Sequence, residues 1–411
     1  MQTTLSDNAK RLARAEEAEH ILRTCVHCGF CNATCPTYQL LGDELDGPRG
    51  RIYLIKQVLE GHPASAKTQL HLDRCLSCRN CETTCPSGVD YHNLLDIGRA
   101  VVDQAVPRPA LQRLVRSSLR QLAAHPETFK HLVYAGRSVE ALLPAAVKAK
   151  LPRHSPVDTS RPPLRHTRQV LMLEGCVQPG LSPNTNAAAA RVLDRLGISA
   201  ISTRAAGCCG AIDYHLDAQA AGIERARQLI DAWWPAIEAG AEAIVHTASG
   251  CGAFVADYGK LLQHDPHYAA KARRVSELSK DLVQLVSAEP LERLACHADQ
   301  LLAVHCPCTL QHALRLGGAL ETVLKRLGFN LSHVADSHLC CGSAGTYSLT
   351  QPALARQLRD NRLDALEDGH PDLIVTANIG CQAHLDSAGR TPVRHWIELV
   401  DAALAKSPSL A

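Results

Sequence analysis

The stretch from residue 25 to residue 36 reads CVHCGFCNATCP, and residues 75–86 read CLSCRNCETTCP. Both place four cysteines in the order Cys-x2-Cys-x2-Cys-x3-Cys, each run ends in proline, and 39 residues separate Cys35 from Cys75. A short turn can present three thiols at this spacing around one metal centre, and the proline keeps a helix from drawing the fourth thiol away. The duplicated pattern therefore predicts two metal centres in the first quarter of the chain.

Bacterial two-cluster ferredoxins have this spacing, in which each run gives three thiolates to one [4Fe–4S] cluster and its fourth cysteine crosses to the other. Disulfides or zinc are the alternatives, but zinc sites show paired CxxC and need no further cysteines at this spacing. We therefore expect two [4Fe–4S] clusters. The first is assigned to Cys25, Cys28, Cys31 and Cys85, and the second to Cys75, Cys78, Cys81 and Cys35.

The composition is that of a protein with two or three ordinary domains. The chain has 411 residues, 46% of them hydrophobic, and its formal net charge of +2 does not imply nucleic acid as a partner. Most of the eighteen cysteines are spaced for metal, which indicates a reducing compartment, so we expect a cytoplasmic protein. The charged start of the chain has no apolar core, so we expect no signal peptide, and the sequence has no stretch of roughly 18 apolar residues. Any contact with the inner membrane is therefore expected to be peripheral, at its cytoplasmic face.

The segments around the two cysteine runs have helical patterns. These patterns cover Leu5–Leu22, Arg51–Leu59 and Tyr91–Ala105. Residues 1–105 therefore resemble the all-helical two-cluster domain of respiratory dehydrogenase subunits more than the compact βαβ ferredoxin.

Residues 106–165 carry an excess of positive charge. They contain eleven Lys and Arg residues against three acidic ones, with Leu111, Leu114 and Val115 at helical spacing between arginines. They predict a basic helical linker whose charges are simply solvated. The alternative is a docking surface for anionic lipid headgroups or an acidic partner.

The rest of the chain is an internal duplication, with one copy over residues 166–295 and another over 296–411. For example, VLDRLG at 192–197 returns as VLKRLG at 323–328. Short apolar runs between helical patterns predict parallel α/β units, so the expected fold class is an all-helical domain followed by a duplicated α/β module. The cysteines fall at the carboxyl ends of strands, where open α/β sheets place their ligand sites.

Each copy contains four regularly placed cysteines. In both copies 31 residues separate the first of them from a Cys-Cys-Gly motif, and this equal spacing selects Cys308 over its neighbour Cys306. Four thiols could hold a further iron–sulfur cluster or a zinc ion, with a redox-active dithiol or ordinary buried thiols as alternatives. The first set is Cys176, Cys208, Cys209 and Cys251, and the second is Cys308, Cys340, Cys341 and Cys381.

Other polar residues near the cysteines are weaker candidates. Arg49 and Arg51 could stabilise a reduced cluster or could be ordinary helix-start charges, and Cys296 has no partner by spacing and is expected to be a buried apolar side chain. Five histidines could be ligands or proton carriers for quinone reduction, but with 21 in the chain most proximity is expected by chance. They are His246, His305, His312, His333 and His338.

The sequence lacks the motifs that bind organic cofactors or perform acyl chemistry. It has no GxGxxG after a strand, no P-loop and no GxSxG. We therefore expect no flavin or nicotinamide and no catalytic residue in this chain, which would transfer electrons only.

The doubled cysteine pattern resembles the cysteine-rich, or CCG, domain of the heterodisulfide reductase family. In that family the motif ends in CxxC, and five cysteines can bind a non-cubane cluster. Ala248 and Asn378 stand here in place of the first cysteine of that CxxC, so a five-cysteine cluster is not expected.

The whole arrangement resembles the iron–sulfur subunits of glycolate oxidase, of anaerobic glycerol-3-phosphate dehydrogenase and of L-lactate utilisation. The resemblance is greatest to the glycolate oxidase subunits, through both cysteine runs and GPRGR at 47–51. It implies the electron-transfer subunit of an oxidoreductase complex, inactive alone. Two FAD-binding subunits would oxidise glycolate to glyoxylate, and a membrane quinone would be the final acceptor. A subunit of one of the sister dehydrogenases, a heterodisulfide reductase-like enzyme and a zinc-holding structural role are the alternatives.

Overall fold

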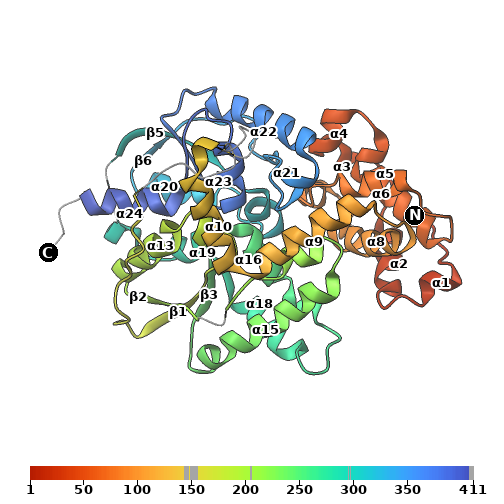
Figure 1. The fold of residues 1–411 in the computed structure, drawn as a ribbon, viewed down its shortest axis with the longest axis horizontal. Helices are drawn as coiled ribbons and strands as arrows, with labels where there is room; N and C mark the ends of the chain where they lie inside the picture. Colours follow the sequence, from red (N-terminus) through yellow and green to blue (C-terminus); the bar gives the residue numbers. More distant parts are fainter. Residues whose placement is uncertain (143–147, 149–155, 204–205, 295, 297, 407–411) are drawn as a thin grey trace.

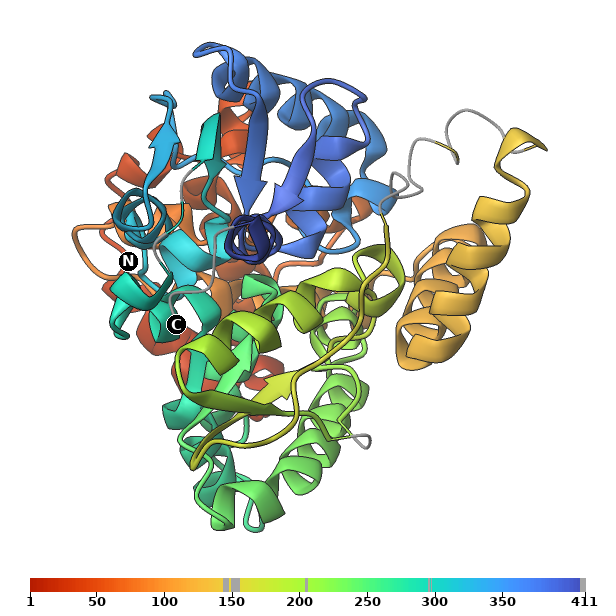
Figure 2. The same ribbon diagram turned by 90° about the vertical axis from the view of Figure 1, so that its left-hand side faces the viewer.

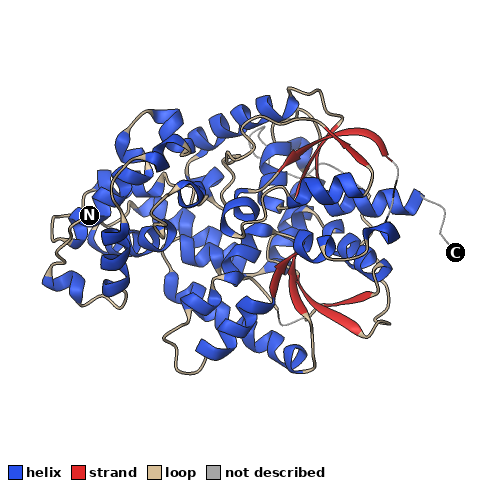
Figure 3. Cartoon of the chain, turned by 180° about the vertical axis from the view of Figure 1, so that it is seen from behind, coloured by secondary structure: helices blue, strands red, loops and turns tan. Residues whose placement is uncertain are grey.

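The computed structural model describes the chain except for residues 143–147, 149–155, 204–205, 295, 297 and 407–411. Figure 1 shows the N-terminal helices gathered at one end of the molecule, with two α/β modules forming the rest. Figure 3, from behind, separates the two sheets, one above the other, with helices around both. We refer to residues 1–105 as the cluster domain, and to 166–295 and 296–411 as the first and second modules.

The cluster domain is helical throughout, as predicted. The helix expected over Leu5–Leu22 is divided into α1 and α2, and Ser6 caps α1 by accepting a hydrogen bond from the backbone N–H of Ala9. Leu22, Ile55 and Leu94 belong to one buried core. The helices are α1 (Asp7–Lys10), α2 (Ala15–Thr24), α3 (Phe30–Ala33), α4 (Pro36–Leu41), α5 (Pro48–Leu59), α6 (Ala66–Asp73), α7 (Asn80–Thr84) and α8 (Tyr91–Ala105).

The basic segment forms a helical hairpin of α9 (Ala110–Ala124) and α10 (Pro126–Ser138), which stands at the side of the molecule in Figure 2. Several of its arginines are paired within the chain. Arg108 contacts Asp73 at 2.6 Å and Asp217 at 2.9 Å, and Arg120 contacts Asp213 at 2.8 Å. Part of the positive charge is thus neutralised by the cluster domain and the first module. Lys150 and Arg153 of the expected linker lie outside the described residues.

Each module is built on a four-stranded parallel sheet. The strand orders are β2-β1-β3-β4 and β6-β5-β7-β8, so the two modules share one topology. The duplication expected from the sequence is therefore present in the fold. The strands are β1 (Arg168–Leu173), β2 (Ile198–Ile201), β3 (Ala243–His246), β4 (Ser279–Asp281), β5 (Ala298–His305), β6 (Phe329–Leu331), β7 (Leu373–Thr376) and β8 (Val393–His395).

Helices cover both faces of the two sheets, as Figures 1 and 3 show. In the part of the chain that the structure describes, no helix is both long and apolar enough to span a membrane. The module helices are α12 (Gln178–Leu181), α13 (Asn184–Arg195), α14 (Ala211–His215), α15 (Gln219–Glu238), α16 (Ser249–Ala256), α17 (Tyr258–Leu261), α18 (Ala269–Leu278), α19 (Leu282–Ser287), α20 (Ala319–Arg326), α21 (Tyr347–Thr350), α22 (Pro352–Glu367), α23 (Ile379–Asp386) and α24 (Trp396–Lys406).

The two modules are held to each other by apolar and polar contacts. One buried core contains Leu193 of the first module and Ile397 of the second. On the same pair of helices, Arg191 of α13 contacts Asp401 of α24 at 2.6 Å. The cysteine-bearing ends of the two sheets are therefore fixed relative to each other.

Candidate metal centres

The first run of cysteines surrounds a cavity together with the last cysteine of the second run. Cys25, Cys28, Cys31 and Cys85 line this cavity, which we call site I. Burial raises the pKa of Cys31 to about 11, and the neighbouring thiols of Cys25, Cys85 and Cys28 also raise it. A thiol with so high a pKa is protonated at neutral pH, and it becomes a thiolate when it binds a metal. The donor set of site I therefore fits a metal centre with soft ligands.

The second run surrounds an adjoining cavity together with the last cysteine of the first run. Cys35, Cys75, Cys78 and Cys81 line this cavity, which we call site II. Cys81 lines both cavities, so the two sites are immediate neighbours. The structure thus places Cys85 beside the first run and Cys35 beside the second, which is the exchange expected from the spacing.

Site II is lined by a buried cation and by hydrogen-bond donors. Arg51 is only 1% exposed, and its Nη1 lies 4.0 Å from the Cys35 sulfur. The Tyr91 hydroxyl donates to the Cys75 sulfur at 3.6 Å, and the backbone N–H of Ser77 donates to the same sulfur at 3.4 Å. Donors of this kind stabilise thiolate and tune the potential of an iron–sulfur cluster. Sequence reasoning identified Arg51 but missed Tyr91, for which no local pattern exists.

Arg51 and Arg49 have different surroundings, although the sequence treats them alike. Arg51 also approaches Asp46, which is fully buried. Arg49 is partly exposed and pairs with Glu44 at 2.6 Å. Both arginines line a cysteine-lined cavity, Arg49 at site I and Arg51 at site II, but only Arg51 is buried.

The outer edge of site I reaches the surface. Cys28 is the one exposed cysteine among the described residues. Val26 is 67% exposed and Phe30 62%, on either side of it in the chain, and Tyr53 is exposed nearby against the ring of His27. Site I therefore has an apolar exposed rim, whereas the cysteines of site II are buried or half-buried.

The inner edge of site II adjoins the second module. Cys78 and Cys308 both pack against an apolar cluster that contains Leu76, Cys340 and Tyr347. Burial raises the pKa of Cys78 well above its usual value, and the Cys308 thiol adds to the rise. The thiols of site II and those of the second module therefore contact the same apolar cluster.

Hydrogen bonds also join the cluster domain to the second module beside site II. The Asn80 amide donates to the His338 carbonyl at 3.1 Å. His312 lies 3.0 Å from the Thr83 hydroxyl through Nδ1 and 3.0 Å from the His338 carbonyl through Nε2. These contacts hold α7 of the cluster domain against the second module.

In the first module the four expected cysteines come together beyond the ends of β1 and β3. The Cys208 thiol contacts both Cys176 and Cys209, and Cys209 in turn contacts Cys251. The backbone N–H of Gly210 donates to the Cys208 sulfur at 3.4 Å. The switch in strand order between β1 and β3 leaves room for ligands at this edge.

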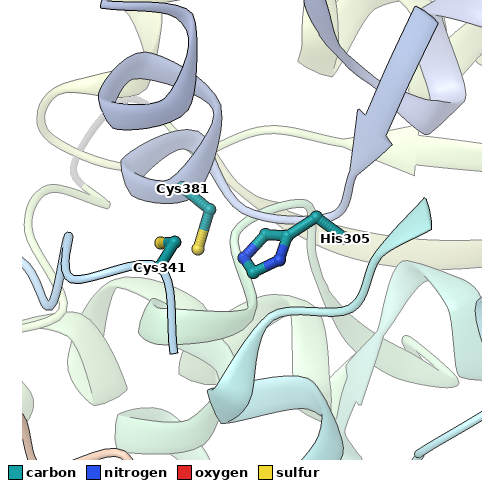
Figure 4. A group of neighbouring side chains, drawn as sticks. All are labelled: His305, Cys341 and Cys381. Carbon is teal, nitrogen blue, oxygen red and sulfur yellow. The ribbon is translucent and has the colours of Figure 1, made fainter. Parts of the chain in front are cut away.

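The second module assembles its cysteines in the same way. The sulfurs of Cys308 and Cys340 are 3.8 Å apart, and Cys341 contacts Cys381. A ring nitrogen of His305 and the sulfurs of Cys341 and Cys381 all lie within 4.8 Å of one another. Figure 4 shows the His305 ring directed at these two sulfurs. The chain turns here through a one-turn π-helix (Thr309–Ala313), a feature frequent at functional sites.

The remaining cysteines lie apart from these sets. Cys306 belongs to the apolar core between the modules, so the spacing argument selected the cysteine that the fold brings to Cys340. Cys296 is buried in the same core, with its thiol directed at the Leu327 carbonyl at 3.4 Å.

The five candidate histidines divide into three groups. His305 lies at the second-module thiols, and His246 lines a cavity with Cys176 and Cys251. Burial lowers the pKa of His246 to about 3, so its ring is neutral. His312 and His338 lie at the contact between the cluster domain and the second module, and His333 is exposed.

Family comparisons agree with this arrangement. A family described as "4Fe-4S dicluster domain" matches residues 21–89, which contain both cysteine runs. A family described as "Cysteine-rich domain" matches twice, over residues 170–256 and 302–386. The two modules are therefore cysteine-rich domains, and the helical domain before them is an iron–sulfur dicluster domain.

A solved structure shares the fold. A crystal structure of a hypothetical protein from Helicobacter pylori aligns with 98% of this chain and 74% of its own, with a TM-score of 0.56 at 10% identity. At this identity the likeness concerns the fold alone.

Curated relatives extend over the full chain. The glycolate oxidase iron-sulfur subunit of Escherichia coli (strain K12) is 67% identical over 99% of this chain and its own entire length. The probable glycolate oxidase iron-sulfur subunit of Bacillus subtilis (strain 168) is 30% identical over 90% of this chain and 88% of its own. Lactate utilization protein A of Bacillus velezensis is more distant, at 26% identity over 52% of this chain and 88% of its own. The chain belongs to the family of glycolate oxidase iron–sulfur subunits.

Proposed function

We propose that this chain is the electron-transfer subunit of a glycolate-oxidising complex, and that it relays electrons one at a time from two flavin-bearing subunits toward a membrane quinone. The observation that carries the proposal is the row of thiol-lined centres: site I open to the surface, site II sharing Cys81 with it, and the second module against site II. Such a row couples a two-electron donor to a distant acceptor. Family membership supplies the substrate, glycolate, and the more distant match to the lactate utilization protein makes lactate the weaker choice.

The ligand assignment is part of the same proposal. Each [4Fe–4S] cluster, when bound, supplies a one-electron carrier. Cys25, Cys28, Cys31 and Cys85 would hold one and Cys75, Cys78, Cys81 and Cys35 the other. Arg51 would oppose negative charge at site II, and Leu76 and Tyr347 would keep water from its inner edge. In the modules, the sets Cys176, Cys208, Cys209, Cys251 and Cys308, Cys340, Cys341, Cys381 would hold further metal.

The same proposal divides the chain into functional parts. Residues 1–105 would carry the two [4Fe–4S] clusters, 106–165 would be the linker, and 166–295 and 296–411 the cysteine-rich units. The separate buried core of the cluster domain and the two separate sheets support this division.

The exposed rim of site I would be the place where a flavin subunit docks. An electron donor must approach a cluster closely, and Val26 and Phe30 flank the exposed Cys28 with apolar surface suited to a protein partner. In the intact complex, Phe30→Glu should leave reduction of the flavin by glycolate intact and sharply lower electron transfer to quinone. The matched control is Leu164→Glu, at another exposed apolar residue, which should change neither. Full quinone-linked activity in Phe30→Glu, with iron content unchanged, would refute docking at this rim.

We propose a cytoplasmic location with peripheral contact at the inner membrane. The support is α9, where Leu111 and Leu114 are exposed beside Arg113 on a hairpin that stands at the side of the molecule. Flotation with anionic vesicles measures this contact: the complex should bind them and lose binding after Leu111→Glu with Leu114→Glu. Equal binding by that variant contradicts the proposed contact.

A further inference from the structure

The two modules hold their cysteines alike but surround them with different side chains. Leu173 and His305 are the last residues of β1 and β5, each three residues before the first cysteine of its set. They pair with equivalent strands, Leu173 with His246 of β3 and His305 with Thr376 of β7. The second module therefore has an imidazole where the first has an aliphatic side chain.

The imidazole of His305 is oriented by a second residue that differs between the modules. The Arg362 Nε donates to His305 Nδ1 at 3.3 Å, and its Nη1 donates to the carbonyls of Ala335 and Asp336 at 3.0 and 2.9 Å. Because a guanidinium nitrogen can only donate, Nδ1 accepts and the neutral ring carries its hydrogen on Nε2. Burial and Arg362 lower the pKa of His305 well below its usual value, which keeps the ring neutral.

The N–H on Nε2 faces the thiols. Within the described residues, Nε2 is buried and has no hydrogen-bond partner. The ring points toward the Cys341 and Cys381 sulfurs in Figure 4, and its nearest nitrogen lies within 4.8 Å of them. A buried N–H group without a hydrogen-bond partner lowers the stability of the fold. We therefore expect an acceptor for this N–H at the thiol site. A protonated nitrogen cannot be a metal ligand, which leaves the role of donor to sulfur.

Asn378 supplies a second donor to the same thiols. Its side-chain oxygen accepts the backbone N–H of Gly250, in the first module, at 3.3 Å. That contact directs the amide nitrogen at the Cys381 sulfur, to which it donates at 3.4 Å. The residue that replaces the missing CxxC cysteine thus serves the site as a hydrogen-bond donor.

The first module has none of these groups at the equivalent positions. Its own buried histidine, His246, lies on the neighbouring strand β3, and its Nε2 pairs with the Ser279 hydroxyl at 2.8 Å. Ala248 stands in the place of Asn378, and Leu173 in the place of His305. Gly210 and Gly342 pack in the same way, on the carbonyls of Gly222 and Ala355. Leu229 lies seven residues after Gly222, and Arg362 lies seven residues after Ala355. The two side chains therefore occupy equivalent positions. Leu173 and Leu229 both belong to one apolar core, so arginine, histidine and asparagine are all exchanged for aliphatic residues.

We propose that His305 and Asn378 are positioning residues that donate hydrogen bonds to the second-module thiolates, and that they give this iron–sulfur site a higher reduction potential than its counterpart in the first module. Donors to sulfur stabilise the more negative, reduced form of a cluster. Arg362 acts through His305 by fixing its tautomer. The inference rests on the proposed function in requiring that the module cysteines hold a cluster. It makes the second module, next to site II, the favoured destination of electrons leaving that site.

The test is a redox titration of the whole complex, purified anaerobically, with EPR detection and iron analysis. Two variants remove donors: Asn378→Ala, and His305→Leu with Arg362→Leu, which copies the first module. Each should shift one signal to lower potential while iron content and the two [4Fe–4S] signals of the cluster domain stay unchanged. The reciprocal Ala248→Asn adds a donor to the first module and should raise the potential of a different signal. It removes no buried group, so it tests the proposal even if the double variant does not fold.

Three results would overturn the inference. Unchanged potentials in the variants with iron retained would show that the donors do not tune the site. Loss of module iron in the histidine variant, with Asn378→Ala unaffected, would make His305 a ligand instead. A wild-type complex with no iron beyond two [4Fe–4S] clusters would remove the site itself, while leaving the relay through sites I and II intact.

Discussion

At the scale of single residues, Asp46 is the counter-charge of Arg51, the buried cation that lines site II. It is fully buried and faces Arg74 at 2.8 Å, His71 at 3.0 Å and Arg51 at 3.5 Å. Asp46→Asn leaves the buried Arg51 without its counter-charge, so we expect a loss of about 3 kcal/mol in the free energy of unfolding. Glu44→Gln is the matched control, because its pair with Arg49 is partly exposed and should contribute less than about 1 kcal/mol. Denaturant unfolding of the iron-loaded protein measures both, and equal losses would contradict this account.

Spacing along the chain was sufficient to predict which cysteines the fold brings together, and insufficient for the residues that reach them through tertiary contact. The sets around Cys25 and Cys75, and the choice of Cys308, follow from intervals along the chain. Asp46 and Tyr91 carry no such signal, because their partners come from other segments of the chain. Asn378 was noted only as a missing cysteine, and its donor role needed the position of Gly250 in the other module.

At the scale of elements, the start of α5 depends on close packing against the turn before it. A Cβ on Gly50 would lie 2.1 Å from the carbonyl oxygen of Glu44, which is backbone and cannot move away alone. Gly50→Ala should therefore destabilise the protein by about 1–3 kcal/mol, although alanine favours a helix by up to about 1 kcal/mol. Gly207→Ala, where a Cβ meets nothing within 4 Å, is the control. Thermal unfolding should separate the two variants, and an unchanged melting temperature in Gly50→Ala would count against this packing.

Element prediction from the sequence succeeded where periodicity was strong. Helix α8 has the bounds that the pattern predicts, and β1, β3, β5 and β7 are short apolar strands between helices, as expected for parallel α/β units. The edge strands β4 and β8 were missed, because their three residues are mostly polar and read SKD and VRH. The sequence left open whether the apolar face of α9 packs on a core or forms a docking surface. In the structure Leu111 and Leu114 point to solvent and not to a core.

At the scale of the whole molecule, His92 fastens the cluster domain to the first module. It contacts Glu82 and Asp90 of its own domain at 3.0 Å each, and Asp257 of the first module at 3.5 Å. Burial lowers the pKa of His92, and so does Arg79, whose Nη2 lies 2.6 Å from both ring nitrogens. Hydrogen bonds to Asp257, Asp90 and Glu82 outweigh both and raise the pKa from 6.5 to about 11. A raised pKa means that folding favours the protonated ring. Its contribution to stability is therefore complete below pH 6.5 and is lost as the pH rises toward 11.

Replacing His92 should accordingly have a pH-dependent effect. His92→Gln should lower the melting temperature most below pH 6.5, and the difference from wild type should shrink steadily as the pH rises. His62→Gln, at an exposed histidine of the same domain, should show no such trend. A difference between wild type and His92→Gln that stays constant with pH would mean that the ring is not held in its protonated form.

Electron transfer through the whole relay is open to a single experiment. The complex, purified anaerobically, is examined by EPR before and after glycolate, L-lactate or glycerol 3-phosphate is added separately. The account predicts signals of reduced clusters with glycolate and not with the other two substrates. Reduced flavin in the presence of glycolate, with iron bound but no cluster signal, would contradict electron transfer through this chain.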